Sequence, residues 1–253
     1  MEELDGFAEV EQAAGGEGLP IWAARGQRDG RLGPGVRAWR CGTALVVASP
    51  DPQQDRLVVR GGSADATELV RWVLGEVGLS YRLLGEAALM DELVRRLSGL
   101  SPVHNFYWME TTSPSETDTA GVRWLSALEL LGVTSLFARF FPDSYAQPGR
   151  AGVHRWGGIV GEGQGAAGPE PLAVAAEAWS AAGCGFMGGV LTHPAARGRG
   201  LARAVSGFVL DDLVHRHGRA ALMVLTGNTS AITTYERLGM SKRLCSAAHM
   251  VAG

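Results

Sequence analysis

The residues with the clearest potential for chemistry lie in a glycine-rich turn that precedes a helical pattern. The turn reads Arg197, Gly198, Arg199, Gly200. Its two glycines allow a tight turn and a close approach of the backbone to a ligand. A helix that begins directly after such a turn presents unpaired N–H groups and its positive dipole end, which together bind phosphate. We therefore predict an anion site here, with Arg197, Arg199 and Arg203 as additional cations.

The segments around the turn predict strand, turn, helix, strand and helix in that order. The first strand covers 185–192, the second strand 222–225 and the last helix 228–240. The helix after the turn has an apolar face, because hydrophobic residues recur at helical spacing. Its members are Leu201, Val205, Phe208, Val209 and Leu213.

Two familiar phosphate loops do not fit this segment. A P-loop requires a Gly-Lys pair, and the chain contains none. The dinucleotide fingerprint G-x-G-x-x-G would need a small residue at Arg203 and an acidic residue on the following strand. Residues 222–225 read Leu-Met-Val-Leu and offer no carboxylate.

Two motifs here resemble the acyl-CoA site of the GNAT superfamily of N-acetyltransferases. The first is Arg197-x-x-Gly200-x-Ala202, which matches the family pattern R/Q-x-x-G-x-G/A. The second pattern, Asn-x-x-Ala-x-x-x-Tyr-x-x-x-Gly, is matched one strand later at every spacing, followed by an apolar residue. Its members are Asn228, Ala231, Tyr235, Gly239 and Met240. The resemblance extends more loosely back to about Val122.

The resemblance implies acetyl-CoA as co-substrate and assigns roles to residues. Tyr235 would face the cofactor sulfur as the catalytic residue, and a backbone N–H of the strand before the turn would meet the thioester oxygen. Asn228 would cap the last helix, which by itself explains its presence. The cofactor-binding residues would be Val190, Leu191, Thr192, Arg197, Gly198, Arg199, Gly200, Leu201, Ala202, Arg203 and Asn228.

The general base is not identified by the sequence. The strand 185–192 carries no carboxylate, and Glu177 lies one strand earlier. His193 and His154 titrate in a suitable range, although a lone histidine is more often structural. A chain of water molecules is a further alternative.

The N-terminal part predicts the same order of elements without the motifs. Three strands, a helix, a strand, a helix and a strand follow Val36, which is the order of the GNAT fold. We expect Asp65 to cap the first of these helices, which would place negative charge where a phosphate would sit. The fold expected is thus α/β (α+β), a tandem of GNAT-like halves with mixed central sheets flanked by helices. An unrelated α+β domain is the alternative for the N-terminal half.

The domains expected are 1–118, degenerate or unrelated, and 119–253, which carries the acyl-CoA site. The polar segment 112–119 is a plausible linker. In the second half a helix is predicted over 126–140. The residues expected on its inward face are Leu128, Leu131, Leu136 and Phe140. Two strands should follow around the glycine-rich turn 161–169.

Composition excludes several other classes of protein. The 253 residues are 46% hydrophobic and 19% charged, as in an ordinary globular chain, and no apolar run is long enough to span a bilayer. The N-terminus is acidic, unlike a signal peptide. Three widely spaced cysteines indicate neither disulfides nor a metal site. We therefore expect a cytoplasmic protein without metal, membrane or nucleic-acid partners; a homodimer stays open.

Two functions are compatible with these features. One is an acetyl-CoA-dependent N-acetyltransferase that acts on a primary amine of a small molecule or peptide, by direct attack in a ternary complex. The other is a catalytically silent acyl-CoA-binding sensor or scaffold module. Tyr235 favours the enzyme, whereas the missing base keeps the silent module open.

Overall fold

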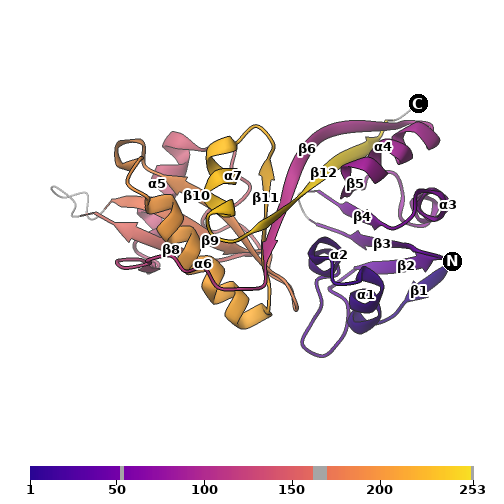
Figure 1. Cartoon of the computed structure of the whole chain (residues 1–253), viewed down its shortest axis with the longest axis horizontal. Coiled ribbons are helices and arrows are strands. Elements are labelled where there is room, and N and C mark those ends of the chain that lie inside the picture. The colour runs from indigo at the N-terminus through magenta and orange to yellow at the C-terminus, as the bar shows by residue number, and fades with distance from the viewer. Residues whose placement is uncertain (52–53, 162–169, 252–253) are drawn as a thin grey trace.

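The strands of the chain form one mixed sheet in the computed structural model, which describes residues 1–51, 54–161 and 170–251 (Figure 1). Within these residues the sheet has 12 strands, in the order β1-β2-β3-β4-β5-β12-β6-β11-β10-β9-β8-β7. The fold class is α+β, as the sequence predicts. No described helix is both long and apolar enough to cross a membrane.

The two halves repeat one order of elements: antiparallel strands, a helix, a parallel strand, a helix and a last strand. The N-terminal half contains β1 (Glu2–Leu4), α1 (Phe7–Ala14), α2 (Gly18–Ala23), β2 (Arg37–Cys41), β3 (Ala44–Ser49), β4 (Arg56–Arg60), α3 (Ser63–Val77), β5 (Arg82–Glu86), α4 (Ala87–Arg96) and β6 (Leu100–Thr111). The C-terminal half contains β7 (Arg123–Trp124), α5 (Leu130–Phe140), β8 (Val153–Val160), β9 (Pro171–Ala178), β10 (Gly185–Thr192), a short 3₁₀ helix (Pro194–Ala196), α6 (Leu201–His217), β11 (Ala220–Leu225), α7 (Thr229–Glu236) and β12 (Ser241–Met250). This repeat confirms the predicted tandem arrangement.

The last strand of each half is inserted into the other half. The C-terminal strand β12 pairs with β5 on one side and with β6 on the other. In turn, β6 lies between β12 and β11. Figure 1 shows β6 and β12 running side by side from one half to the other, so that both chain termini lie at the N-terminal half. The halves are therefore joined by backbone hydrogen bonds rather than by a tether alone.

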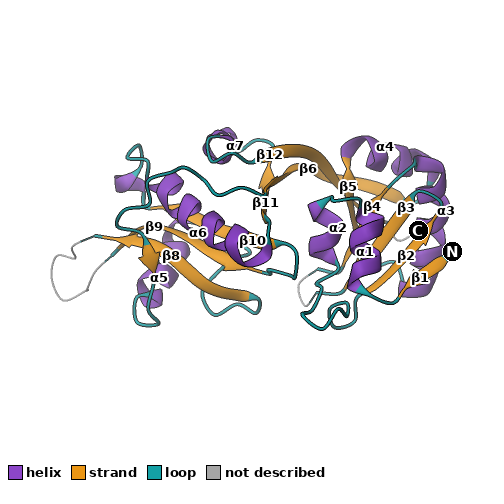
Figure 2. Ribbon diagram, turned by 60° about the horizontal axis from the view of Figure 1, so that its bottom comes forward, coloured by secondary structure: helices purple, strands orange, loops and turns teal. Residues whose placement is uncertain are grey.

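Helices cover both faces of this sheet (Figure 2). In the N-terminal half α3 and α4 pack on one face, and α1 and α2 on the other. In the C-terminal half α6 and α7 pack on one face and α5 on the other. The inner strands β3 and β9 are apolar and buried along almost their whole length, as a sheet covered on both faces requires.

A cluster of aromatic rings also joins the halves. Trp22 of α2 stacks on Phe186 of β10 at 4.9 Å between ring centroids and lies 5.8 Å from Trp108 of β6. All three side chains are at most 5% exposed. The indole Nε1 of Trp22 donates a hydrogen bond of 2.9 Å to the backbone oxygen of Trp179. Rings of this size dominate the free energy of an interface through the area they bury, so the halves share a core.

The segment predicted as a linker packs along α6. The backbone N–H of Ser115 donates to Asp211 at 2.6 Å, and Thr117 accepts from Arg203 at 3.0 Å. Gly207 of α6 leaves the space for this passage, because a Cβ there would lie 2.9 Å from the Ser115 hydroxyl. The segment thus connects the halves and is held against α6 by these hydrogen bonds.

Two local predictions in the helices are wrong. Helix α3 begins at Ser63 with Gly62 as its N-cap, and the Asp65 carboxylate instead accepts hydrogen bonds from the backbone N–H and hydroxyl of Thr43, each 2.8 Å. Helix α5 begins only at Leu130, since Glu129 folds back onto Ser126. As a result Leu128 and Leu131, predicted to face inward, are 77% and 66% exposed.

The remaining elements follow the predicted order with shifted ends. Leu136 is buried as expected, and α5 turns Val133 and Phe137 inward beside it. The turn predicted at 161–169 lies outside the described residues except for its first position, residue 161.

The exchange of β6 and β12 predicts that the C-terminal half is not an independent folding unit. A fragment of residues 119–253 lacks β5 and β6, and should therefore expose long unpaired strand edges. We expect no cooperative thermal transition by circular dichroism for this fragment alone, and a transition after the fragment 1–118 is added. A melting temperature equal to that of the full chain for 119–253 alone would contradict this expectation and favour two separable domains.

Candidate functional site

Strands β10 and β11 diverge and leave a wedge in the sheet. They pair only at Gly185–Ala220 and Phe186–Ala221. From Met187 onward β10 pairs with β9 alone. The backbone groups on the other edge of β10 are consequently available to a ligand, because no strand among the described residues pairs with them. Val190 and Thr192 lie on the face of α6 and α7, whereas Leu191 packs on the opposite side.

A β-bulge in β10 shapes this wedge. Its register against β9 shifts between Gly188 and Leu191 by one extra residue on β10. Gly189 has a φ of 59°, and a Cβ at this position would lie 2.7 Å from the Trp156 ring. Only glycine therefore fits the bulge, which bends β10 away from β11.

The wedge leads to the predicted anion-binding turn. Gly198 and Gly200 both have a φ of 76°, and no atom of the described part of the chain lies within 4 Å of a Cβ placed on either. Gly200 is the N-cap of α6, which continues for 17 residues, so its unpaired N–H groups open onto free space. The side chains of Arg197 and Arg199 are exposed and have no hydrogen-bond or ion-pair partner among the described residues. Arg203 instead donates to Thr117.

The second motif lies on α7 and the turn that precedes it. The Asn228 side chain accepts a hydrogen bond of 3.2 Å from the backbone N–H of Ala231 and so caps α7, as predicted. Tyr235 points into the core beside α6 and β11 and is 7% exposed. Burial raises the pKa of its hydroxyl. No described residue makes a hydrogen bond to this hydroxyl, so Tyr235 has a donor to offer.

Comparisons with known proteins agree with this geometry. The family described as FR47-like protein matches residues 165–248. A GCN5-related N-acetyltransferase from Kribbella flavida superposes with a TM-score of 0.55 at 20% identity, over 86% of this chain and 90% of that chain. A putative GNAT-family acetyltransferase from Novosphingobium aromaticivorans gives 0.52 at 18% identity, over 81% and 92%. None of the curated proteins matches this chain.

The chain has the GNAT acetyltransferase fold, with an FR47-like domain in its C-terminal part. The solved GNAT structures align over more than four fifths of the chain, so the likeness takes in both halves.

The N-terminal GNAT-like half has lost most of its wedge. Strands β4 and β5 pair at three positions, the last being Val58–Leu84, and only Val59 and Arg60 of β4 remain beyond them. A Cβ on Gly85 would lie 2.7 Å from the backbone oxygen of Val59, so the two backbones are in contact there.

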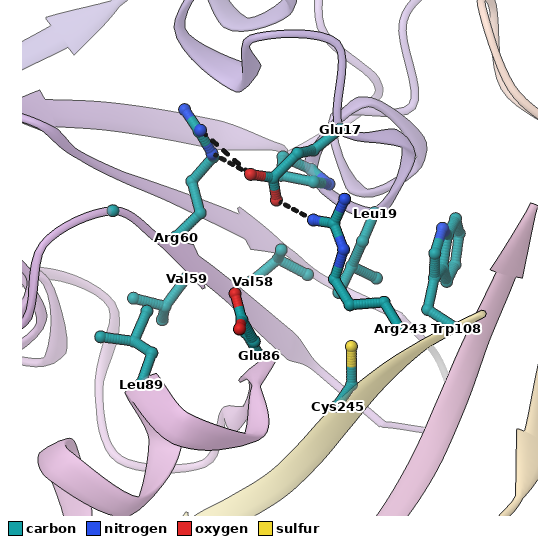
Figure 3. A pocket seen from close by; sticks show the side chains of 12 residues that line it. Glu17, Leu19, Val58, Val59, Arg60, Glu86, Leu89, Trp108, Arg243 and Cys245 are labelled. Carbon is teal, nitrogen blue, oxygen red and sulfur yellow. Dashed lines mark hydrogen bonds and ion pairs between the residues drawn. The ribbon is translucent and has the colours of Figure 1, made fainter. Parts of the chain in front are cut away.

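An ion bridge occupies the end of this closed wedge (Figure 3). The Glu17 carboxylate lies between Arg60, at 3.0 Å, and Arg243 of β12, at 2.5 Å. The cavity beside it has a volume of about 50 Å³, enough for a few water molecules but not for a pantetheine arm. Asp65 adds negative charge near the start of α3. The N-terminal half is therefore poorly suited to hold CoA.

The candidate bases do not gather at the open wedge. Glu177 pairs with Met187, directly after the last position where β10 and β11 are joined, and is 3% exposed. Burial alone would raise the pKa of its carboxyl, but the nearby His217, whose Nε2 lies 3.7 Å away, and the guanidinium groups of Arg216 and Arg155, in direct contact with it, lower this pKa well below its usual range. Glu177 is thus an anion held in an ion network, which makes it a poor proton acceptor.

The two candidate histidines, His193 and His154, also lie outside the β10–β11 wedge. His193 follows β10, and its Nδ1 accepts a hydrogen bond of 3.2 Å from the Ala195 backbone, so it caps the short 3₁₀ helix. His154 is exposed on β8, which β9 separates from β10.

The lowered pKa of Glu177 predicts an acid-sensitive fold. A carboxyl with a depressed pKa stabilises the folded state above its unfolded pKa of about 4.3 and loses this contribution as the pH falls below that value. We expect Glu177→Gln to lower the free energy of unfolding at pH 7 by about 2 kcal/mol, since the buried amide replaces charged hydrogen bonds from Arg155 and Arg216, while both arginines keep Asp212. Below pH 4.3 the difference from the wild type should shrink, as measured by urea unfolding.

Glu92→Gln, in an exposed ion pair of α4, is the matched control and should change stability by less than about 1 kcal/mol. A Glu177→Gln variant whose stability tracks the wild type from pH 7 to pH 3 would show that the network contributes nothing.

Proposed function

We propose that the chain is an acetyl-CoA-dependent N-acetyltransferase whose site lies in the C-terminal half. The observation that carries this proposal is the open β10–β11 wedge, which ends at the unobstructed glycine turn before α6. The free edge of β10 leads directly to the N-terminus of α6. The strand edge can pair with a long amide arm and the helix N-terminus can bind a pyrophosphate, and CoA contains both groups.

The residues of the wedge fit this cofactor. The first N–H groups of α6 and the backbone of Gly198 and Gly200 would hold the pyrophosphate, with Arg197 and Arg199 as mobile cations. The edge of β10 from Val190 to Thr192 would pair with the amides of the arm. The hydroxyl of Thr192 is buried with no hydrogen-bond partner in the described chain, and such a group is normally paired. A ligand amide at β10 would supply that partner.

The bound thioester supplies an activated acetyl group. A neutral primary amine forms the new C–N bond at the carbonyl carbon, the C–S bond breaks, and the amine loses its proton to solvent. The bulged backbone of β10 orients N–H donors that stabilise the developing oxyanion.

Tyr235 would donate a hydrogen bond to the departing thiolate. Full proton transfer from tyrosine, with a reference pKa of about 10, to a thiolate whose thiol has a pKa near ~8.5 is uphill by ~1.5 units, or about 2 kcal/mol. The raised pKa of buried Tyr235 makes the transfer still less favourable. Its hydroxyl is therefore suited to stabilise the leaving sulfur without giving up its proton.

A silent acyl-CoA-binding module remains the second candidate. It is favoured by the surroundings of the three candidate bases. Glu177 is held in ion pairs, the ring of His193 packs against Phe140 of α5, and His154 lies on β8, two strands from the wedge. The release of free thiol from acetyl-CoA with a panel of amines separates the two: turnover supports the enzyme, and tight CoA binding without turnover supports the module.

The glycine turn predicts the CoA-binding behaviour of one substitution. Gly200→Glu places a side chain on a residue with positive φ and brings negative charge to the phosphate position, so we expect CoA binding to be lost in calorimetry. Gly149→Glu is the matched control, because Gly149 has a φ of 77° and equally open space but no helix behind it. The wild type should bind one CoA per chain. Unchanged affinity in Gly200→Glu would remove the turn from the proposal, and two bound CoA molecules would show that the N-terminal half is a working site as well.

The unpaired hydroxyl of Tyr235 predicts a modest catalytic effect. We expect Tyr235→Phe to lower kcat about tenfold, the value of one hydrogen bond, with little change in CoA affinity because the ring is retained. Tyr81→Phe in the N-terminal half is the control. Thiol release and calorimetry on the same preparations measure both quantities. An unchanged kcat would reduce Tyr235 to a core residue.

A further inference from the structure

Four basic side chains lie together on the sheet face that carries α1 and α2. Arg56 of β4 stands opposite Arg82 of β5, and Arg82 stands opposite His249 of β12. His104 of β6 is opposite Ala247, two residues before His249. Neighbours directly opposite in a sheet share a face. His104 and His249 are exposed and Arg82 is half-buried, so this end of the face is open to solvent.

Arg82 differs from Arg56 in this basic cluster because its guanidinium has no partner in the described chain. Arg56 pairs with Asp51 at 2.9 Å, and Asp55 accepts from the Ser80 hydroxyl and from the Asp51 backbone. The Arg82 guanidinium has no hydrogen-bond or ion-pair partner among the described residues, and its Nε is buried. A buried donor without a partner carries a desolvation cost, which a bound anion would remove.

Besides its burial, the pKa of His104 also reflects the positive charge of Arg82, which no anion balances among the described residues. Burial, and next the positive charge of Arg82, lower the pKa of its imidazole. Only β12 separates the strands that carry Arg82 and His104, and both residues lie on the same face of the sheet. The surface between Arg82 and His104 therefore favours an anion. An anion bound there would raise the pKa of His104.

The basic cluster adjoins the rim of the β10–β11 wedge. On the same face Phe106 of β6 stands opposite Leu225 of β11, the last residue of that strand. His104 is two residues further along β6, and adjacent strands are about 4.8 Å apart. Leu225 is 60% exposed and forms an apolar surface between the wedge and the basic cluster.

We propose that Arg82 and His104 form an anion subsite for the acceptor, which is thus a small amine that also carries a carboxylate. The amine would enter the wedge, the apolar part of the molecule would cross Leu225, and the carboxylate would meet the planar fork of Arg82. From strand spacing, the amine and the carboxylate are separated by roughly 8–10 Å, or about two strand spacings, which an extended six-carbon amino acid can span. This subsite rests on the proposed acetyltransferase function for its role, but not for its ability to bind an anion.

The first test measures binding without turnover. The imidazole signal of His104 is titrated by NMR in the full chain, with and without 6-aminohexanoate. In the wild type the probe should raise the pKa of His104 by about one unit, the effect of an opposite charge nearby. Arg82→Met should raise this pKa in the free protein and abolish the response. Arg71→Met, an exposed residue of α3 on the opposite face, should behave as wild type. A His104 signal indifferent to the probe, or a response retained in Arg82→Met, overturns the subsite.

The second test compares acceptors that differ in one group. 6-Aminohexanoate should have a kcat/KM at least about tenfold above that of hexylamine, since hydrogen bonds to charged groups contribute about 1.5–3 kcal/mol. Arg82→Met should reduce this ratio to about one and leave CoA affinity unchanged. Equal rates for the two amines in the wild type overturn the subsite.

Two further outcomes separate the proposals. A preference for 6-aminohexyl phosphate, which spans a similar distance, over both amines supports the anion subsite and assigns it to phosphate. If CoA binds but no amine is acetylated, the acetyltransferase function fails, and the His104 titration alone then decides whether the anion subsite exists.

Discussion

The structure depends on the exchange of β6 and β12 between the halves. Each strand completes the hydrogen bonds of the other half, so that neither half has its own full sheet. Unpaired backbone groups in a buried sheet are costly, and the exchange removes that cost only when both halves are present. The aromatic contacts of Trp22 with Phe186 and Trp108 add an apolar core at the same junction.

The two halves differ where a ligand would bind, although their element order is the same. In the C-terminal half the bulge at Gly189 directs β10 away from β11, and two glycines keep the following turn open. In the N-terminal half β4 and β5 stay together, and Glu17 neutralises Arg60 and Arg243 at their ends. One half thus retains a wedge, while the other has become a packed core.

The packed half still contributes to the open one. Trp22 holds the backbone oxygen of Trp179, a residue with a φ of 51°. A bulky residue in this conformation is strained and persists only where its surroundings fix it. Through β6 the same half also brings His104 beside β11. A half without a wedge of its own therefore forms one wall next to the wedge of its neighbour.

The sequence by itself determined the local features of the site. The turn at 197–200, the cap at Asn228 and the inward position of Tyr235 depend on backbone conformation and helical spacing, which a few neighbouring residues fix. Two predictions from local pattern were wrong. Asp65 does not cap α3 but accepts a hydrogen bond from Thr43, which is distant in the chain. Leu128 does not face inward, because it lies before the first turn of α5. The strand exchange, the ion network around Glu177 and the meeting of Arg82 with His104 were decided only by the tertiary structure. They join residues far apart in the chain, and strand pairing between such segments leaves no periodic signal in either one.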